Sequence, residues 1–189
     1  METAFVICTI LLILYSALAL FDGVYLHLYK YRLHEYKECK FEHLIHTIRA
    51  FLFSGILYTL FISIENNKLF FIGVLFIFLD IFIMTIDAFV EKDSREFMGG
   101  LPRWEYMIHL LVNGFHFAGL AVFLVLKINL TKEGMMSLQN NFQEFESYNL
   151  FKIIVLNILP GSILIGLLHV LVYIPGFNFY FRKIQLKCC

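Results

Sequence analysis

Charged residues are scarce in this chain of 189 residues: Asp, Glu, Lys and Arg make up 16% of it, and the formal net charge is zero. A soluble domain carries about 25% charged residues, so the composition argues against a soluble protein. Basic stripes and zinc-finger spacings are missing, so we expect no nucleic-acid partner. The glycine-rich fingerprints of nucleotide-binding loops are missing too, which argues against a nucleotide-dependent enzyme.

Cysteine is also rare, with four copies. No Cys-x-x-Cys pair occurs, and Cys8 lies on the predicted outer side of the membrane, away from the other three cysteines, so no disulfide framework is expected. Cys188 and Cys189 follow basic residues at the end of the chain and form a candidate lipidation site. An unmodified tail is the favoured interpretation.

What the chain has in abundance is apolar sequence: 60% of its residues are hydrophobic, 22 are Phe, and the mean hydropathy is +0.76. Five apolar runs each approach the ~20 residues that span a bilayer as a helix. They are continuous, whereas the strands of a membrane barrel alternate over about ten residues. We therefore predict an all-α, polytopic membrane protein with a single domain over 1–189. The predicted helices are about 3–29, 43–64, 68–92, 104–127 and 151–174, with an outer polar loop at 128–150.

The first run could be mistaken for a signal peptide, because Ala17-Leu18-Ala19 resembles a cleavage site. Its n-region, Met1-Glu2-Thr3, has no basic residue, which favours a retained helix. Ten basic residues lie at one end of the predicted bundle, in 30–41, 92–104 and the tail, against four at the other end. This bias predicts an outer N-terminus and a cytoplasmic C-terminus. As a separate expectation, the protein is placed in a bacterial inner (cytoplasmic) membrane.

Ionisable residues interrupt these apolar runs in a repeating order: a carboxylate, then Glu-x-x-x-His, then a second carboxylate, then a second Glu-x-x-x-His. Charged groups inside a membrane are costly, so they usually face a protein interior and mark a function. At a rise of about 1.5 Å per residue, the His and Asp side chains lie about 8–12 Å from the cytoplasmic helix ends. The predicted layer contains Asp22, Glu42, His46, Asp87, Glu105 and His109.

Carboxylates and imidazoles together suit iron, manganese or zinc. The order resembles the diiron carboxylate four-helix bundles of the ferritin-like class, which use single Glu residues from two helices and Glu-x-x-His from two others. In this chain the Glu-to-His spacing is four instead of three, and Asp replaces both single Glu residues. The resemblance implies two iron ions held by Asp22, Asp87, the Glu42/His46 pair and the Glu105/His109 pair.

A second resemblance concerns two short strings and implies a membrane location without an activity. They are similar to sequences in an uncharacterised family of bacterial integral membrane proteins. The strings are Asp22-Gly23-x-x-Leu26-His27-Leu28 and Glu42-His43-x-x-His46-Thr47-x-Arg49-Ala50.

Other polar residues in the apolar runs have competing interpretations. Glu42 and Glu105 could instead cap the first turns of their helices. His27 lies about 140° around an α-helix from Asp22, and His34 and His43 are likewise favoured as structural. A salt-bridge network around Arg49 could account for several charges without a metal. The residues predicted to surround the ligands and support them are Arg49, Asn113, His116 and His169.

The leading hypothesis is a membrane-embedded metal-binding protein, a dinuclear-iron oxidoreductase acting on a lipid or quinone-like substrate near the cytoplasmic face. A b-type haem protein is one alternative, with His46 facing His116 or His169 as axial ligands. A zinc-dependent lipid hydrolase is another. The non-enzymatic alternative is a transporter or proton relay lined by Asp80 and Asn113. The partners expected are membrane lipid and either a redox partner or a second copy of the chain.

Overall fold

The computed structural model describes residues 1–130, 134 and 136–186, and it is 82% helical. Within those residues, five helical spans are long and apolar enough to cross a membrane. Both findings confirm the prediction of an all-α protein with five candidate membrane helices. The proposed lipidation site at Cys188 and Cys189 lies outside the described residues.

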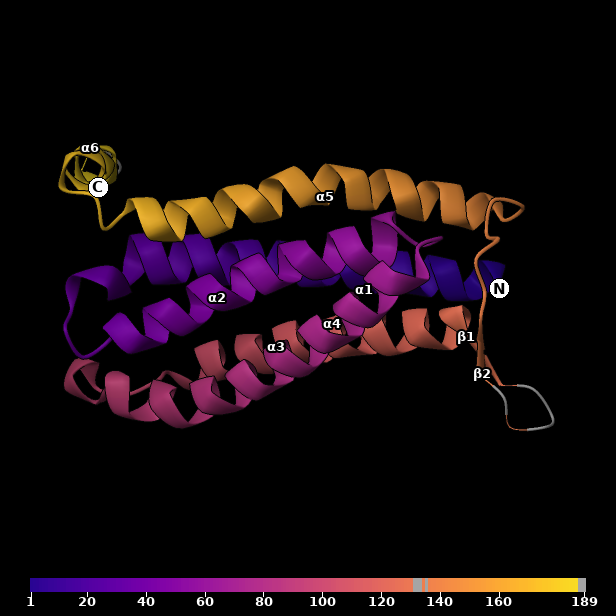
Figure 1. The fold of residues 1–189 in the computed structure, drawn as a ribbon. Coiled ribbons are helices and arrows are strands. Elements are labelled where there is room, and N and C mark those ends of the chain that lie inside the picture. Colours follow the sequence, from indigo (N-terminus) through magenta and orange to yellow (C-terminus); the bar gives the residue numbers. More distant parts are fainter. Residues whose placement is uncertain (131–133, 135, 187–189) are drawn as a thin grey trace.

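The five long spans run from one end of the bundle to the other, and each is antiparallel to the next span along the chain (Figure 1). Two membrane spans change from α-helix to π-helix along their length: α1 (Glu2–Leu20) continues as η1 (Phe21–Lys30), and α2 (Lys40–Ile56) continues as η3 (Leu57–Ile62). The remaining spans are α3 (Asn67–Ser94), α4 (Arg103–Lys127) and α5 (Glu146–Leu171). Short 3-10 turns, η2 (Leu33–Glu35) and η4 (Glu96–Met98), lie in the connections at one end.

Two elements were not predicted. The outer loop contains a short antiparallel hairpin of β1 (Ile128–Leu130) and β2 (Met136–Leu138), in which Asn129 pairs with Ser137. A further helix, α6 (Pro175–Leu186), follows α5 and begins at Pro175. Proline suits the first turn of a helix, where its missing N–H has no helical partner. Figure 1 shows α6 end-on, so it runs across the bundle.

The spans pack around α1 and α2. Helix α1 packs against α4 and α5, and α2 packs against α3 and α5. Aromatic side chains fill the core at the end that carries the N-terminus and the hairpin. Ring centroids there are 4.7–5.3 Å apart, a spacing typical of edge-to-face aromatic pairs. The buried rings are Phe5, Phe61, Phe123, Phe142 and Phe151.

Candidate metal centre

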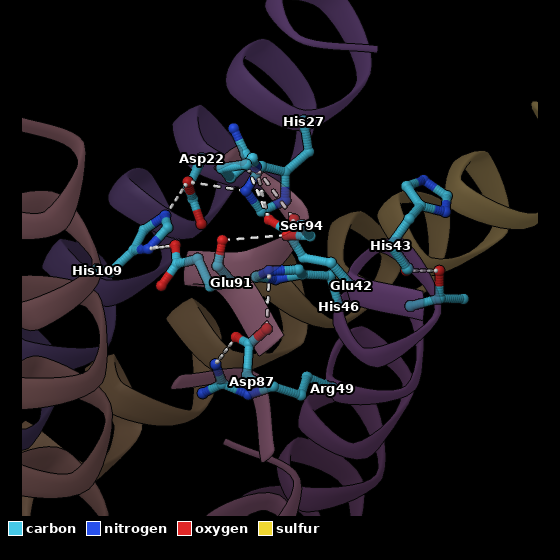
Figure 2. Close-up of polar contacts among 12 residues, drawn as sticks. Asp22, His27, Glu42, His43, His46, Arg49, Asp87, Glu91, Ser94 and His109 are labelled. Carbon is cyan, nitrogen blue, oxygen red and sulfur yellow. Dashed lines mark hydrogen bonds and ion pairs between the residues drawn. The ribbon is translucent and has the colours of Figure 1, made fainter. Parts of the chain in front are cut away.

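The other half of the bundle holds a cluster of ionisable side chains centred on His27 (Figure 2). His27 is fully buried, and its ring centroid lies 4.1 Å from that of His46 and 6.0 Å from that of His109. In two groups of three residues, the possible metal-binding atoms lie within 4.8 Å of one another, and His27 belongs to both. One group is Asp22, His27 and His46; the other is His27, Glu105 and His109. We call these five residues the His27 cluster.

The π-helical turn of η1 explains why His27 faces the cluster. In an α-helix, residues five apart point about 140° away from each other. A π-helix instead hydrogen-bonds residues five apart and so places them one above the other. Tyr31 N–H donates such a bond to the Leu26 carbonyl at 2.8 Å. As a result, His27 Nε2 lies 3.5 Å from Asp22 Oδ1, and both side chains face the bundle interior.

Several polar atoms of the cluster are buried without a hydrogen bond. Both ring nitrogens of His27 and Nε2 of His46 have no hydrogen-bond partner within the described part of the chain. Leaving a buried polar group unsatisfied costs about 1–3 kcal/mol. A single cation between these rings would satisfy several of them at once. The cluster therefore has the donor set and the unpaired atoms that a metal ion requires.

His109 is held between two carboxylates. Its Nε2 lies 3.0 Å from Asp22 Oδ1, and its Nδ1 contacts Glu91 Oε1. A carboxylate on the ring nitrogen opposite a metal is a common way to orient a ligating histidine. Glu91 was not among the predicted site residues, although it lies one helical turn after Asp87 and therefore on the same face of α3.

Asp87, a predicted ligand, belongs to neither group of the His27 cluster. Together with the predicted supporting residues of α2 and α4, it extends the cluster towards the middle of the spans. Asp87 Oδ1 lies 3.4 Å from His46 Nε2, and Asp87 Oδ2 lies 3.7 Å from Arg49 Nη1. Arg49 also donates to Asp80 Oδ1 at 3.1 Å and to Asn113 Oδ1 at 2.7 Å. His116 Nε2 in turn lies 3.2 Å from Asp80 Oδ2. Asp87 thus lies between the cluster and a network that pairs the Arg49 charge.

Glu42, a predicted ligand, lies in a separate ion-pair network. Arg95 donates to its two oxygens at 2.8–3.1 Å, and the Ser94 hydroxyl also donates to it. The other side of the guanidinium lies 3.3 Å from Glu105 Oε1. Arg95 is only 1% exposed; burial opposes its charge, but the two carboxylates raise the pKa of Arg95 above its ordinary value. Arg95 therefore joins the Glu residues of the two Glu-x-x-x-His pairs.

Cys39 belongs to the same buried region and gives a direct test of this packing. Its thiol is fully buried and donates to the Ser94 carbonyl at 3.3 Å, and burial raises the pKa of Cys39 to about 11. Because the thiolate is the reactive form, we expect alkylation at pH 8 to be at least roughly 100-fold slower than for an exposed thiol. Mass-spectrometric mapping of labelled cysteines, before and after unfolding, measures this. Equal labelling of Cys39 in both states would contradict the packing.

His169, the remaining residue predicted to support the ligands, lies against the backbone of η1. Its Nε2 lies 3.1 Å from the Gly23 carbonyl oxygen, and it is in neither of the two groups of the His27 cluster. The polypeptide backbone next to Asp22 thus separates His169 from the predicted ligands.

Two cavities reach the cluster from different sides. One, of about 380 Å³, lies between α1, α2 and α5 and has mostly apolar walls. The other, of about 540 Å³, is lined by residues of α2, α3 and α4 together with Asp22 of η1. Asp22, His46 and Arg49 line both. An apolar cavity with a few polar groups at one end is the usual form of a small-molecule site.

Comparison of this chain with protein-family models, curated proteins and solved structures gives no match. The geometry of the His27 cluster and its cavities is therefore the basis for assigning a function.

Proposed function

We propose that this protein is an integral membrane metalloprotein whose His27 cluster binds divalent transition-metal ions. The observation that carries the proposal is the gathering of three imidazoles and two carboxylates into two groups that share His27, whose ring nitrogens are both buried without a hydrogen bond. Mixed imidazole and carboxylate ligands suit iron, manganese and zinc. The ligands we propose are Asp22, His27, His46, Glu105 and His109.

The proposal includes two ions, as in the diiron resemblance, but with a changed ligand set. His27 belongs to both groups. To hold one ion on each ring nitrogen, the imidazole would give up its N–H proton and bridge the two ions as an imidazolate. Glu42 is committed to Arg95 and is replaced in the proposal by His27. Glu91 takes the role of the carboxylate that orients His109. Asp87 Oδ1, which lies 3.4 Å from the His46 Nε2 offered to the metal, would place a negative charge beside the ion.

We further propose that the centre is an oxidoreductase acting on a lipid or quinone-like substrate. Bound iron would supply one-electron and oxygen chemistry. The mostly apolar walls of the 380 Å³ cavity suit the hydrocarbon chain of a lipid or the isoprenoid chain of a quinone. The polar end of the substrate would lie at Asp22 and His46. Buried helices around the cluster would exclude water from the reaction. The bias of basic residues favours placing this centre towards the cytoplasmic face.

The packing of the opposite half of the bundle favours an enclosed site and argues against a transport path. In the described part of the chain, the network of buried ionisable groups extends as far as Asp80 and His116. The His116 ring lies 4.5 Å from that of Tyr15, and the aromatic core begins beyond it. A continuous path for ions would need polar groups or water through this region.

Metal analysis of the purified full-length protein tests the first part of the proposal. The protein would carry no polyhistidine tag, because such a tag binds the same ions. In a His34→Gln/His43→Gln background, in which a separate group of histidines cannot add metal, we expect about one or two equivalents, and at least a tenfold lower content once His46→Ala/His109→Ala are added. His116→Ala should keep its metal because His116 bonds to Asp80. A wild type that neither contains nor takes up iron, manganese or zinc would contradict the proposal.

Catalysis needs a separate test. The metal-loaded protein would be placed in lipid nanodiscs containing a quinol or unsaturated lipids under air, and the products followed by mass spectrometry. We expect oxidised product with wild type and background levels with His27→Ala. Metal binding without turnover of either substrate would leave a metalloprotein but overturn the assignment of these substrates.

A further inference from the structure

Three more histidines gather on the other side of α2 from the His27 cluster. They come from separate elements: His34 from η2, His43 from α2 and His169 from α5, and they are 5%, 0% and 1% exposed. The ring of His43 lies 4.8 Å from that of His169 and 5.9 Å from that of His34. Figure 2 shows His43 directed away from His27 and His46.

The hydrogen bonds of this group use only one nitrogen on each of two rings. His43 Nδ1 lies 2.9 Å from the Tyr173 hydroxyl, and His169 Nε2 lies 3.1 Å from the Gly23 carbonyl oxygen, to which it donates. The opposite atoms, His43 Nε2 and His169 Nδ1, are buried without a hydrogen bond inside the described ranges. Both nitrogens of His34 are also buried without a hydrogen bond. The Glu35 carboxylate lies 3.7 Å from His34 Nε2, which is too long for a hydrogen bond.

This is the pattern of histidines that hold a metal. A ligating imidazole normally donates its other N–H to a carbonyl, carboxylate or hydroxyl, which fixes the tautomer and leaves the opposite nitrogen with a lone pair. The Gly23 carbonyl sets His169 in this way, and Tyr173 can do the same for His43 if its oxygen accepts from Nδ1–H. Three neutral imidazoles around one ion, with a fourth position for water, form a known zinc site.

We propose that His34, His43 and His169 form a second metal site, selective for a zinc-type divalent ion. An all-imidazole set lacks the carboxylates that favour manganese and suits zinc, copper or nickel instead. The His43 and His169 rings lie 17° from parallel, so they must turn about their Cβ–Cγ bonds to face one ion. Tyr173 and the Gly23 carbonyl are the positioning groups of the site.

Metal titration of the stripped, untagged protein in detergent separates the two sites. The probe is Co²⁺, followed by its visible absorption, with Zn²⁺ displacement to give the affinity. In the His27→Ala/His46→Ala background, which lacks the first site, we expect one equivalent still to bind. Adding His34→Gln should remove it, because glutamine keeps a polar side chain but has no imidazole. Tyr173→Phe should weaken binding about 10–100-fold and leave the stoichiometry unchanged.

Two results would overturn this inference. The first is a folded His27→Ala/His46→Ala protein that binds no Co²⁺. The second is unchanged Co²⁺ affinity after His34→Gln and after His43→Gln in that background, with the same thermal unfolding temperature as the parent. If instead the wild type binds one equivalent that is lost with His34→Gln and kept with His27→Ala, the second site stands while the proposed His27 centre fails.

Discussion

Replacing His27 by alanine is expected to remove metal from the membrane centre almost completely. His27 belongs to both groups of possible ligands, so its loss breaks two coordination sets at once. Losing a residue that only orients a ligand already weakens metal binding about 10–100-fold, and we therefore expect a loss above about 100-fold for His27→Ala. Competition with a chelator of known affinity, carried out in the His34→Gln/His43→Gln background so that the second site does not contribute, measures the change.

The matched control for that variant is His116→Ala. His116 is also a buried histidine of the bundle, 5% exposed, but its Nε2 lies against Asp80 outside the cluster. We expect its metal affinity to stay within about threefold of wild type, because neither group of ligands includes it. Equal loss of affinity in the two variants would indicate that the helical packing, and not His27 as a ligand, governs metal content.

The second large effect is expected at Arg95. Removing one partner of a buried ion pair leaves an uncompensated charge and costs about 3–5 kcal/mol. Arg95→Ala would strand Glu42, which is 0% exposed and takes three hydrogen bonds from this guanidinium. Thermal or denaturant unfolding in detergent measures the loss of stability.

Arg182→Ala is the control for Arg95→Ala. Arg182 lies 2.9 Å from Glu35 but its side chain is 51% exposed, and an exposed pair contributes about 0–1 kcal/mol. The triple variant Glu42→Gln/Glu105→Gln/Arg95→Met should recover much of the loss, since replacing Arg95 together with both of its carboxylate partners leaves no unpaired buried charge. Similar small effects from Arg95→Ala and Arg182→Ala would refute the buried network.

The five spans could be predicted because a bilayer demands about 20 apolar residues in each helix. Their ends were less accurate: the second and fifth spans begin at Lys40 and Glu146, earlier than the predicted 43 and 151. The first turns of these two helices contain polar residues, so a search for apolar runs does not include them. Helix α6 was not predicted, because its 12 residues are too few for the membrane-spanning length that identified the other helices.

Most ligands of the candidate metal centre could be predicted from the sequence, but His27 could not, because its direction depends on a π-helical turn. Depth along the helices selected Asp22, His46 and His109, and the Glu-x-x-x-His spacing added Glu105. The structure brings these side chains together around His27. His27 itself was set aside because an α-helical geometry directs it away from Asp22. The π-helical turn that reverses this has no simple signature in the sequence.

Glu42 illustrates a different limit. Its spacing from His46 is correct for one helix face, but a residue beyond the end of α3, Arg95, takes both of its carboxylate oxygens. A partner from a connecting segment follows no periodicity, so residue spacing alone could not predict that competition. Arg95 contributed to the sequence prediction only as one of the basic residues that indicate orientation.

X-ray absorption at the metal edge of the untagged protein is the most direct test of the proposed centre. The His34→Gln/His43→Gln background would be used so that the second site does not contribute. The account predicts a shell of nitrogen and oxygen ligands near 2.0–2.2 Å, with imidazole scattering beyond it and no sulfur near 2.3 Å. Loss of the imidazole signal in His27→Ala is expected as well. An edge spectrum with only water ligands, or no bound metal after loading, would contradict it.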